Sequence, residues 1–185
     1  MLPAGAEPLV LIGLMATGKS TVGRRIAERR GWRFVDTDAA IVEKHGPIPV
    51  IFAEAGEAGF RRIEAATVSE VFADADGGTV ISLGGGSVLN QGTRTLLASA
   101  HVVFLDADLA TVLPRISGDT GRPLLTGGPG ETWARLEKER RPIYESLADT
   151  VIDTRGATID VVVDRLEDHL NRRHISTERI TGDDR

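Results

Sequence analysis

Residues 13–21, with the sequence GLMATGKST, contain the clearest chemical signal in this chain. The pattern Gly-x-x-x-x-Gly-Lys-Ser is typical of a Walker A loop, in which backbone N–H groups and a helix N-terminus surround phosphate oxygens. In such a loop Lys19 reaches the β- and γ-phosphates of a nucleoside triphosphate, and the Ser20 hydroxyl is a ligand of Mg²⁺. The loop residues expected to bind nucleotide are Gly13, Ala16, Thr17, Gly18, Lys19, Ser20 and Thr21.

The context of this loop decides between two readings of it. A glycine turn that only caps a helix is the alternative, but the full pattern stands between an apolar run and a helical segment, which favours phosphate binding. The sequence contains no guanine-reading Asn-Lys-x-Asp segment, and its short Asp-x-x-Gly match at residues 153–156 lies too near the C-terminus for a GTPase switch. Motor proteins need larger or partner-linked domains, so we expect a small molecule to receive the phosphoryl group.

Two carboxylates follow the second predicted strand, in the sequence Asp36-Thr37-Asp38. Ligands of open α/β folds bind at the carboxyl ends of the strands, so both side chains are expected at the site. One can serve the metal and the other a substrate hydroxyl. One of them can also be the N-cap of the next helix, and that role is compatible with function for the other.

Arginines at three separate places point to an anionic substrate. Arg61 falls in the first turn of one predicted helix, and Arg140 lies in a later helix. Arginine suits two-pronged binding of a carboxylate, although Arg61 taken alone would more often lie on a solvated helix face. Arg122 lies within residues 117–130, SGDTGRPLLTGGPG, which we expect to be a flexible loop that closes over the nucleotide.

Three consecutive glycines, Gly84, Gly85 and Gly86, follow the third predicted strand. Without side chains, their backbone N–H groups can approach a ligand closely. A plain flexible turn explains the same residues equally well in isolation. Their position at the edge of the predicted sheet favours the functional reading.

Short β-type runs alternate with helical segments along the chain and supply the scaffold for these residues. Strands are predicted at residues 9–12, 33–35, 79–83, 101–105 and 151–152. Helices are predicted at residues 19–30, 37–44, 60–72, 91–98, 109–116, 131–147 and 158–172. This alternation predicts parallel strands joined by helices in a doubly wound α/β fold. Residues 1–185 are then a single domain, with a flexible polar tail at about 174–185.

Composition limits the partners and the location that we expect. The net charge of -5 and the pI of about 5.4 give no general attraction for nucleic acid or an anionic membrane, so we expect neither as a partner. The absence of cysteine from the sequence excludes disulfides and fits a reducing compartment. The chain begins without a basic leader and has no apolar run of membrane-spanning length, so we expect a cytoplasmic protein, acting as a monomer.

Six motifs, in order, resemble the shikimate kinase family. Beside the Walker A loop, the Asp36-Thr37-Asp38 stretch and the three glycines, they are Gly-Glu-x-x-Phe-Arg-x-x-Glu at 56–64, Arg-Pro-Leu-Leu at 122–125 and Arg-x-Pro-x-Tyr at 140–144. The resemblance implies a P-loop three-layer α/β fold with a five-stranded parallel sheet, a lid at about 117–130 and a helical acceptor-binding region at about 37–64. It implies transfer of the ATP γ-phosphoryl group to the 3-hydroxyl of shikimate, in the pathway to chorismate and the aromatic amino acids.

The resemblance also implies how the acceptor is bound. Asp38 would hold the acceptor hydroxyls and take or orient their proton. Arg61 and Arg140 would bind the carboxylate of shikimate, and the Gly85 N–H would meet a hydroxyl. The residues implied to bind shikimate are Asp38, Phe52, Phe60, Arg61, Gly84, Gly85, Gly86 and Arg140.

On the nucleotide side, the cofactors implied by the resemblance are ATP and Mg²⁺. Asp36 would bind the metal through water, together with Ser20. Arg122 would reach the nucleotide from the lid, and Arg115 with Arg155 would lie near the adenine. The catalytic residues implied are Lys19, Asp38 and Arg122.

Two departures from the family pattern bear on these expectations. Ala16 stands where family members usually carry a third loop glycine, so nucleotide affinity should fall if that position needs a positive φ. Residues 46–52, GPIPVIF, are shorter and richer in proline than the usual form. Two alternatives stay open: a kinase for another small hydroxy acid such as gluconate, and an ATP-binding module without catalysis.

Overall fold

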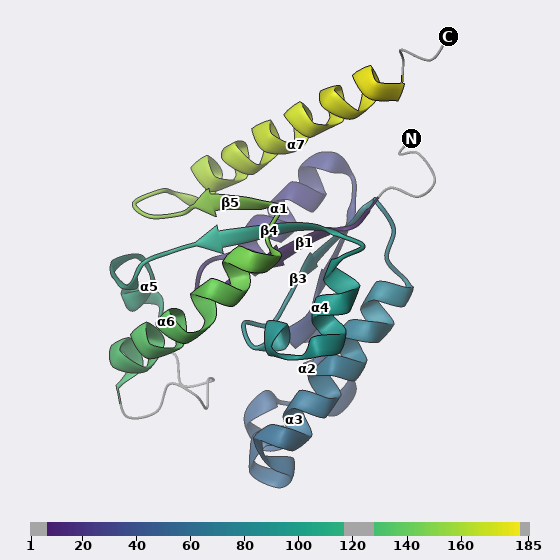
Figure 1. The fold of residues 1–185 in the computed structure, drawn as a ribbon. Coiled ribbons are helices and arrows are strands. Elements are labelled where there is room, and N and C mark those ends of the chain that lie inside the picture. The colour runs from purple at the N-terminus through teal and green to yellow at the C-terminus, as the bar shows by residue number, and fades with distance from the viewer. Residues whose placement is uncertain (1–6, 117–127, 182–185) are drawn as a thin grey trace.

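The computed structural model describes residues 7–116 and 128–181 of the chain. Within these residues five parallel strands form one sheet in the order β2-β3-β1-β4-β5 (Figure 1). The strands are β1 (Leu9–Ile12), β2 (Arg33–Asp36), β3 (Thr79–Ser82), β4 (His101–Asp106) and β5 (Thr150–Asp153). Each pair of consecutive strands is joined through at least one helix, which confirms the predicted doubly wound α/β class and its five-stranded parallel sheet.

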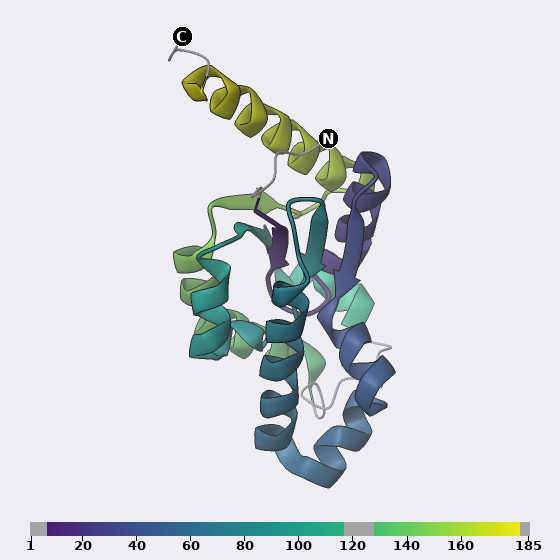
Figure 2. The same cartoon turned by 90° about the vertical axis from the view of Figure 1, so that its right-hand side faces the viewer.

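Helices cover both faces of the sheet (Figures 1 and 2). They are α1 (Lys19–Arg30), α2 (Thr37–His45), α3 (Ile48–Ala73), α4 (Gln91–Leu97), α5 (Leu109–Ile116), α6 (Pro129–Leu147) and α7 (Ile159–Thr181), with a 3₁₀ turn at Ser87–Leu89. The apolar residues of α1 and α7 pack on one face, and those of α3, α4, α5 and α6 pack on the other. The described part of the chain therefore has three layers.

The central strand β1 explains how the two faces are built. Leu9 and Leu11 belong to the cluster beneath α1 and α7, whereas Val10 and Ile12 belong to the cluster on the opposite face. All four side chains are buried, because successive residues of a strand point to opposite faces and helices cover both. Full burial of such a side chain contributes roughly 1.5–3 kcal/mol, so the continuous apolar run is sufficient to place this strand at the centre.

The strand order places two loops next to one another. β1 pairs with β3, with Leu11 opposite Ser82, and the Leu83 N–H donates to the Leu11 carbonyl at 3.1 Å. Because the two strands are parallel, the loop after β1 and the glycine turn after β3 leave the same edge of the sheet. The P-loop (residues 13–21) therefore lies beside the glycine turn (residues 84–86).

Two predicted helix boundaries are wrong. The helical part of α3 that carries Arg61 begins after the non-helical Gly56, and an unpredicted part precedes it from Ile48, so Arg61 lies beyond the first turn. α3 contains a kink at Gly56, where φ is 67° and ψ is 178°, and this non-helical residue divides it into two helical parts. The last helix continues beyond its expected end at residue 172, to Thr181.

Most of the expected lid, residues 117–127, lies outside the described residues. No helix in the ranges described is both long enough and apolar enough to cross a membrane.

Candidate active site

A cavity of about 550 Å³ opens at the carboxyl edge of the sheet. Its walls come from the P-loop, the end of β2, the α2–α3 region and the glycine turn. The predicted site residues that line it are Ala16, Gly18, Lys19, Ser20, Thr21, Asp36, Asp38, Phe52, Phe60, Arg61, Gly84, Gly85 and Arg115. Residues far apart in the sequence, expected to bind either nucleotide or acceptor, thus share one cavity.

The P-loop is held in shape by its own polar groups. Lys19 Nζ donates to the Leu14 carbonyl at 2.8 Å, and the Thr17 hydroxyl donates to the same carbonyl at 3.0 Å. Gly13 has a φ of 140°, and a Cβ there would lie 2.8 Å from the Leu105 carbonyl oxygen, so a side chain does not fit. Among the described residues, none caps the start of α1 with a side chain, which leaves its first N–H groups available to an anion.

Ala16 adopts the left-handed backbone conformation, with a φ of 65°. This conformation costs a residue with a Cβ roughly 1–2 kcal/mol, whereas it costs glycine little. Position 16 therefore has the positive φ for which the sequence predicts a lower nucleotide affinity with alanine than with glycine.

Asp36 combines two functions at the end of β2. Its Oδ1 accepts hydrogen bonds from the N–H groups of Asp38 and Ala39, at 3.0 and 3.1 Å, which makes it the N-cap of α2. Its Oδ2 accepts a bond from the Ser20 hydroxyl at 2.5 Å, and Ser82 Oγ lies 3.4 Å from Ser20 Oγ. Hydroxyl and carboxylate oxygens are the hard ligands that Mg²⁺ prefers, so this pair fits the predicted metal site.

The stretch Asp36-Thr37-Asp38 is tied to the glycine turn. The Gly84 N–H donates to the hydroxyl of the fully buried Thr37 at 3.0 Å. A Cβ at Gly84 would lie 2.7 Å from Asp38 Oδ1 and 2.9 Å from Glu64 Oε1. Glycine is therefore required here, because a side chain would displace the carboxylate expected to bind the acceptor.

Arg61 is held against the glycine turn by Glu64. Arg61 Nη1 donates to Glu64 Oε2 at 2.7 Å, and the Ser87 hydroxyl donates to Glu64 Oε1 at 2.9 Å. A Cβ at Gly86 would lie 2.1 Å from Arg61 Nη1, so the guanidinium lies directly on that glycine. Burial lowers the pKa of Arg61, but the charge and hydrogen bond of Glu64 outweigh it and raise the pKa overall. The cation is thus fixed and permanently charged.

Arg140 approaches the same turn from α6. Its Nη1 donates to the Gly85 carbonyl at 3.3 Å, and the Tyr144 hydroxyl donates to that carbonyl at 2.6 Å. Arg140 is only 6% exposed, and burial raises the pKa of Tyr144 to about 12. Arg61 and Arg140 therefore converge on one short turn, although 78 residues separate them in the chain.

The aromatic wall of the cavity lies in the α2–α3 region. The rings of Phe52 and Phe60 are 4.7 Å apart between centroids, and both pack in a small apolar cluster with Ile41 and Ile51. This cluster is separate from the two that cover the sheet. It gives the acceptor side of the cavity its own apolar support.

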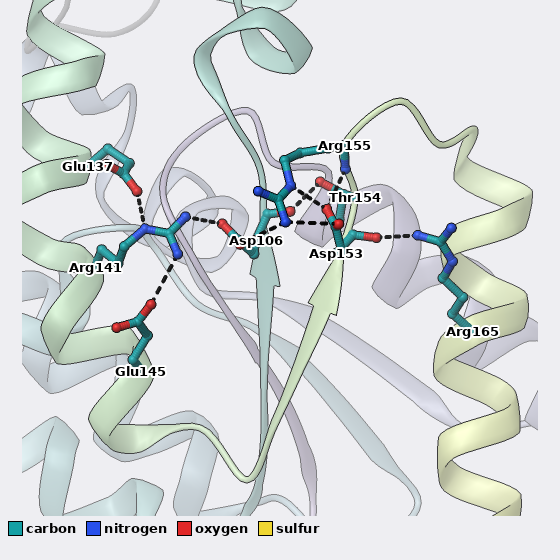
Figure 3. A network of polar contacts seen from close by, with 8 residues as sticks. All are labelled: Asp106, Glu137, Arg141, Glu145, Asp153, Thr154, Arg155 and Arg165. Atoms are coloured by element: carbon teal, nitrogen blue, oxygen red, sulfur yellow. Dashed lines mark hydrogen bonds and ion pairs between the residues drawn. The ribbon is translucent and has the colours of Figure 1, made fainter.

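A network of charged side chains borders the carboxyl ends of β4 and β5 (Figure 3). Arg141 contacts Asp106 and Glu137 and donates to Glu145 at 3.0 Å. Arg155 makes a two-pronged contact with Asp153, at 2.8 and 2.9 Å, and this contact lowers the pKa of Asp153 to about 2. The network fixes Arg155 beside the strand ends; the family resemblance implies that Arg155 lies near the adenine.

Some predicted site residues surround the cavity and do not line it. They are Gly13, Thr17, Gly86, Arg140 and Arg155. Arg122 lies outside the described residues. Glu64 and Tyr144 end two of the quoted motifs but carry no predicted role, and Ile159 is in none of the motifs. Glu64 and Ile159 nevertheless line the cavity, and Tyr144 supports Gly85. The spacing of Glu64, three residues after Arg61 on a helix, was the one available signal.

Known proteins with similar sequences and structures form a consistent set. The profile of a family described as Shikimate kinase matches residues 15–171. A shikimate kinase of Thermobifida fusca (strain YX) is 45% identical over 151 residues, 80% of this chain and 87% of the relative. One of Mycobacterium avium (strain 104) is 44% identical over 167 residues, 87% of this chain and 94% of the relative. The solved structure of shikimate kinase from Acinetobacter baumannii in complex with shikimate has a TM-score of 0.83 and 34% identity, covering 90% of this chain and 94% of that one.

Proposed function

The chain belongs to the shikimate kinase family, and we propose how its residues carry out ATP-dependent transfer of a phosphoryl group to the 3-hydroxyl of shikimate. The observation that carries the proposal is the convergence of Arg61 and Arg140 on the glycine turn, beside Asp38. A small acid with several hydroxyls needs this combination of fixed cations and a carboxylate.

On the acceptor side, Arg61 and Arg140 bind the carboxylate of shikimate and thereby fix its orientation. Phe52 and Phe60 contact its ring. Asp38 accepts hydrogen bonds from the hydroxyls and takes or orients the proton of the attacking one. Glu64 keeps Arg61 in place before the acid arrives.

On the nucleotide side, the P-loop amides and Lys19 bind the β- and γ-phosphates of ATP. Ser20 and Asp36 hold Mg²⁺, which neutralises phosphate charge when bound with the nucleotide. Arg115 lies at the cavity wall, and we propose that it lies near the adenine of the bound nucleotide. We propose that Arg122 meets the transferring group from the lid in the closed state and that Arg155 lies near the adenine. We further propose a cytoplasmic monomer.

The reaction then depends on position and charge more than on covalent chemistry by the protein. Bringing the hydroxyl and the γ-phosphoryl group together in one cavity replaces a bimolecular encounter. The cations Lys19 and Arg61 both line that cavity, and we assign the first to the phosphates and the second to the acid, so each anion has its own partner.

A coupled assay of ADP release tests the proposal, with ATP, Mg²⁺ and either shikimate or gluconate as acceptor. We expect turnover with shikimate and little with gluconate, and ³¹P NMR of the product should locate the phosphate on the 3-hydroxyl. Turnover with gluconate alone would assign a different acceptor. ADP binding with no turnover on any acid would indicate a nucleotide-binding module.

A further inference from the structure

Ala16 is the one residue other than glycine with a positive φ among those that the structure describes. It stands at the crest of the P-loop and lines the cavity. Contacts must hold this backbone, because an alanine left alone favours other conformations. The bonds within the loop go to the Leu14 carbonyl, so they do not hold the two carbonyls that flank the Ala16 Cα.

Two side chains from other elements contact the carbonyl groups on both sides of this residue. Trp133 Nε1, in α6, donates to the Met15 carbonyl at 3.1 Å. Arg115 Nη1, in α5, donates to the Ala16 carbonyl at 2.9 Å. The first bond fixes the peptide plane before the Ala16 Cα, which sets φ, and the second fixes the plane after it, which sets ψ. Together they act on both backbone dihedrals of the strained residue.

The same two bonds also direct the loop amides. In a trans peptide the N–H points away from the carbonyl, and the described residues contain no cis peptide. With the Met15 and Ala16 carbonyls directed toward outside donors, the N–H groups of Ala16 and Thr17 point the opposite way. Successive amides next to a left-handed residue form a concave anion site.

The two donors differ in how firmly they are held. Trp133 is 2% exposed and packs in the core on the α6 face of the sheet, so its single polar group cannot swing away. Arg115 is exposed and lines the cavity, where a bound nucleotide can engage it instead. The permanent constraint on the loop therefore comes from Trp133.

We propose that Trp133 is a positioning residue for nucleotide binding, which fixes the Met15 carbonyl and so keeps the P-loop amides directed at phosphate in spite of the alanine at position 16. This inference rests on the proposed use of ATP. The family usually carries a glycine at position 16, which adopts this conformation freely. Here the hydrogen bond from Trp133 holds the alanine in it instead.

The test is a double-mutant cycle between Trp133→Phe and Ala16→Gly, with ADP affinity measured by calorimetry. Trp133→Phe removes the N–H and keeps an aromatic ring. We expect it to weaken ADP binding about tenfold with Ala16 present, and by threefold or less in the Ala16→Gly background, since glycine adopts the loop conformation without help. An equal loss in both backgrounds, or no loss in either, overturns the proposal.

Three controls separate positioning from general damage. Leu136→Val changes the same buried face of α6 but removes no hydrogen bond to the loop, because leucine has no polar side-chain group, and it should leave ADP affinity unchanged. Shikimate affinity should be the same in every variant. If wild-type protein binds no ADP, the proposed function fails rather than this inference.

Should Trp133→Phe not fold, the wild type still decides. The chain has two tryptophans, so two indole N–H signals can be assigned by NMR. Exchange of the Trp133 indole proton with solvent should be slow without nucleotide and at least as slow with ADP. Rapid exchange of the Trp133 indole proton in both states overturns the proposal. The indole proton of Trp32, which lies outside the loop, is the reference.

Discussion

Ser20 Oγ and Asp36 Oδ2 lie 2.5 Å apart, which joins the first turn of α1 to the end of β2. The pair brings together two side-chain oxygens from separate motifs, both of which we propose to hold Mg²⁺. Because Asp36 is also the N-cap of α2, a substitution that tests its metal role must preserve the cap.

Asp36→Asn satisfies that requirement, since asparagine caps helices about as well as aspartate. Loss of the charge should raise the Mg²⁺ concentration needed for half-maximal turnover by roughly tenfold, as expected for a charge-assisted contact. A Mg²⁺ titration of the coupled assay measures this. An unchanged midpoint, in a variant of unchanged thermal stability, would remove Asp36 from the metal site.

Lys19→Ala should lower kcat severely while the fold survives. The ammonium group meets the charge of the β- and γ-phosphates, and loss of one such preorganised donor costs roughly 10²–10³ in rate. Lys44→Ala is the matched control, because Lys44 pairs with Glu70 at the surface. Near-normal turnover of a well-folded Lys19 variant would refute the assigned role.

Replacement of Arg61 or Arg140 by Ala should weaken shikimate binding by roughly tenfold to a hundredfold and leave ATP binding almost unchanged. The magnitude follows from about 1.5–3 kcal/mol for a charged hydrogen bond. Because both arginines serve one carboxylate, the double mutant should depart from additivity. Calorimetric titration of shikimate into the three variants measures these effects.

Two further variants control this experiment. Arg61→Lys keeps a positive charge beside the buried Glu64 but loses the two-pronged geometry, so only part of the affinity should return. Arg62→Ala removes an exposed arginine from the same helix and should change nothing. Unchanged shikimate affinity in both Ala variants would mean that the acceptor of the family does not carry over to this chain.

His101 lies at the end of the sheet away from the cavity, and it should make the stability of the fold sensitive to acid. Its Nε2 lies 3.1 Å from His169 Nε2, and its Nδ1 faces both Arg173 and Asp149. Burial, together with Arg173, lowers the pKa of His101 to about 4, against 6.5 for an exposed histidine. The unfolded chain therefore binds this proton more tightly, and stability should fall as the pH drops from about 6.5 through 4.

Chemical denaturation across this pH range measures the effect. His101→Gln should flatten the decline, because glutamine does not titrate. His45→Gln, at an exposed position on α2, should leave the decline as it is in the wild type. A wild-type free energy of unfolding that is constant between pH 6.5 and 4 contradicts the assignment.

The sequence predicts most of the fold because its signals are local. The apolar run at residues 9–12 and the loop after it define β1, the P-loop and the start of α1 without reference to the rest of the chain. The start of α3 was missed because Pro47 and Pro49 suggest a loop. Proline is tolerated in the first turn of a helix, where its missing N–H would have no partner.

The site is less predictable where its contacts are distant in sequence. Trp133 and Met15 meet across 118 residues, and the sequence around Trp133 shows only an amphipathic helix. Ile159 and Gly18 are also far apart in the sequence and close in the fold. A Cβ placed on Gly18 would lie 3.4 Å from the Cδ1 atom of Ile159. Glu64 is the intermediate case, since its spacing from Arg61 is visible but its burial is not.

The position of α7 has a consequence for how the protein is made. α7 is the last described helix, yet Ile159 lines the cavity, and Val163 and Leu166 cover the same sheet face as α1. During synthesis β1 and its loop leave the ribosome long before α7, which covers this face of the sheet. Leu9 and Leu11 can pack against α1 early, but the part of their sheet face that Val163 and Leu166 cover stays open until α7 has been made. A chain that ends before α7 should therefore leave apolar side chains of this sheet face open to water and lack one wall of the cavity, so we expect it to aggregate more readily than the chain with α7.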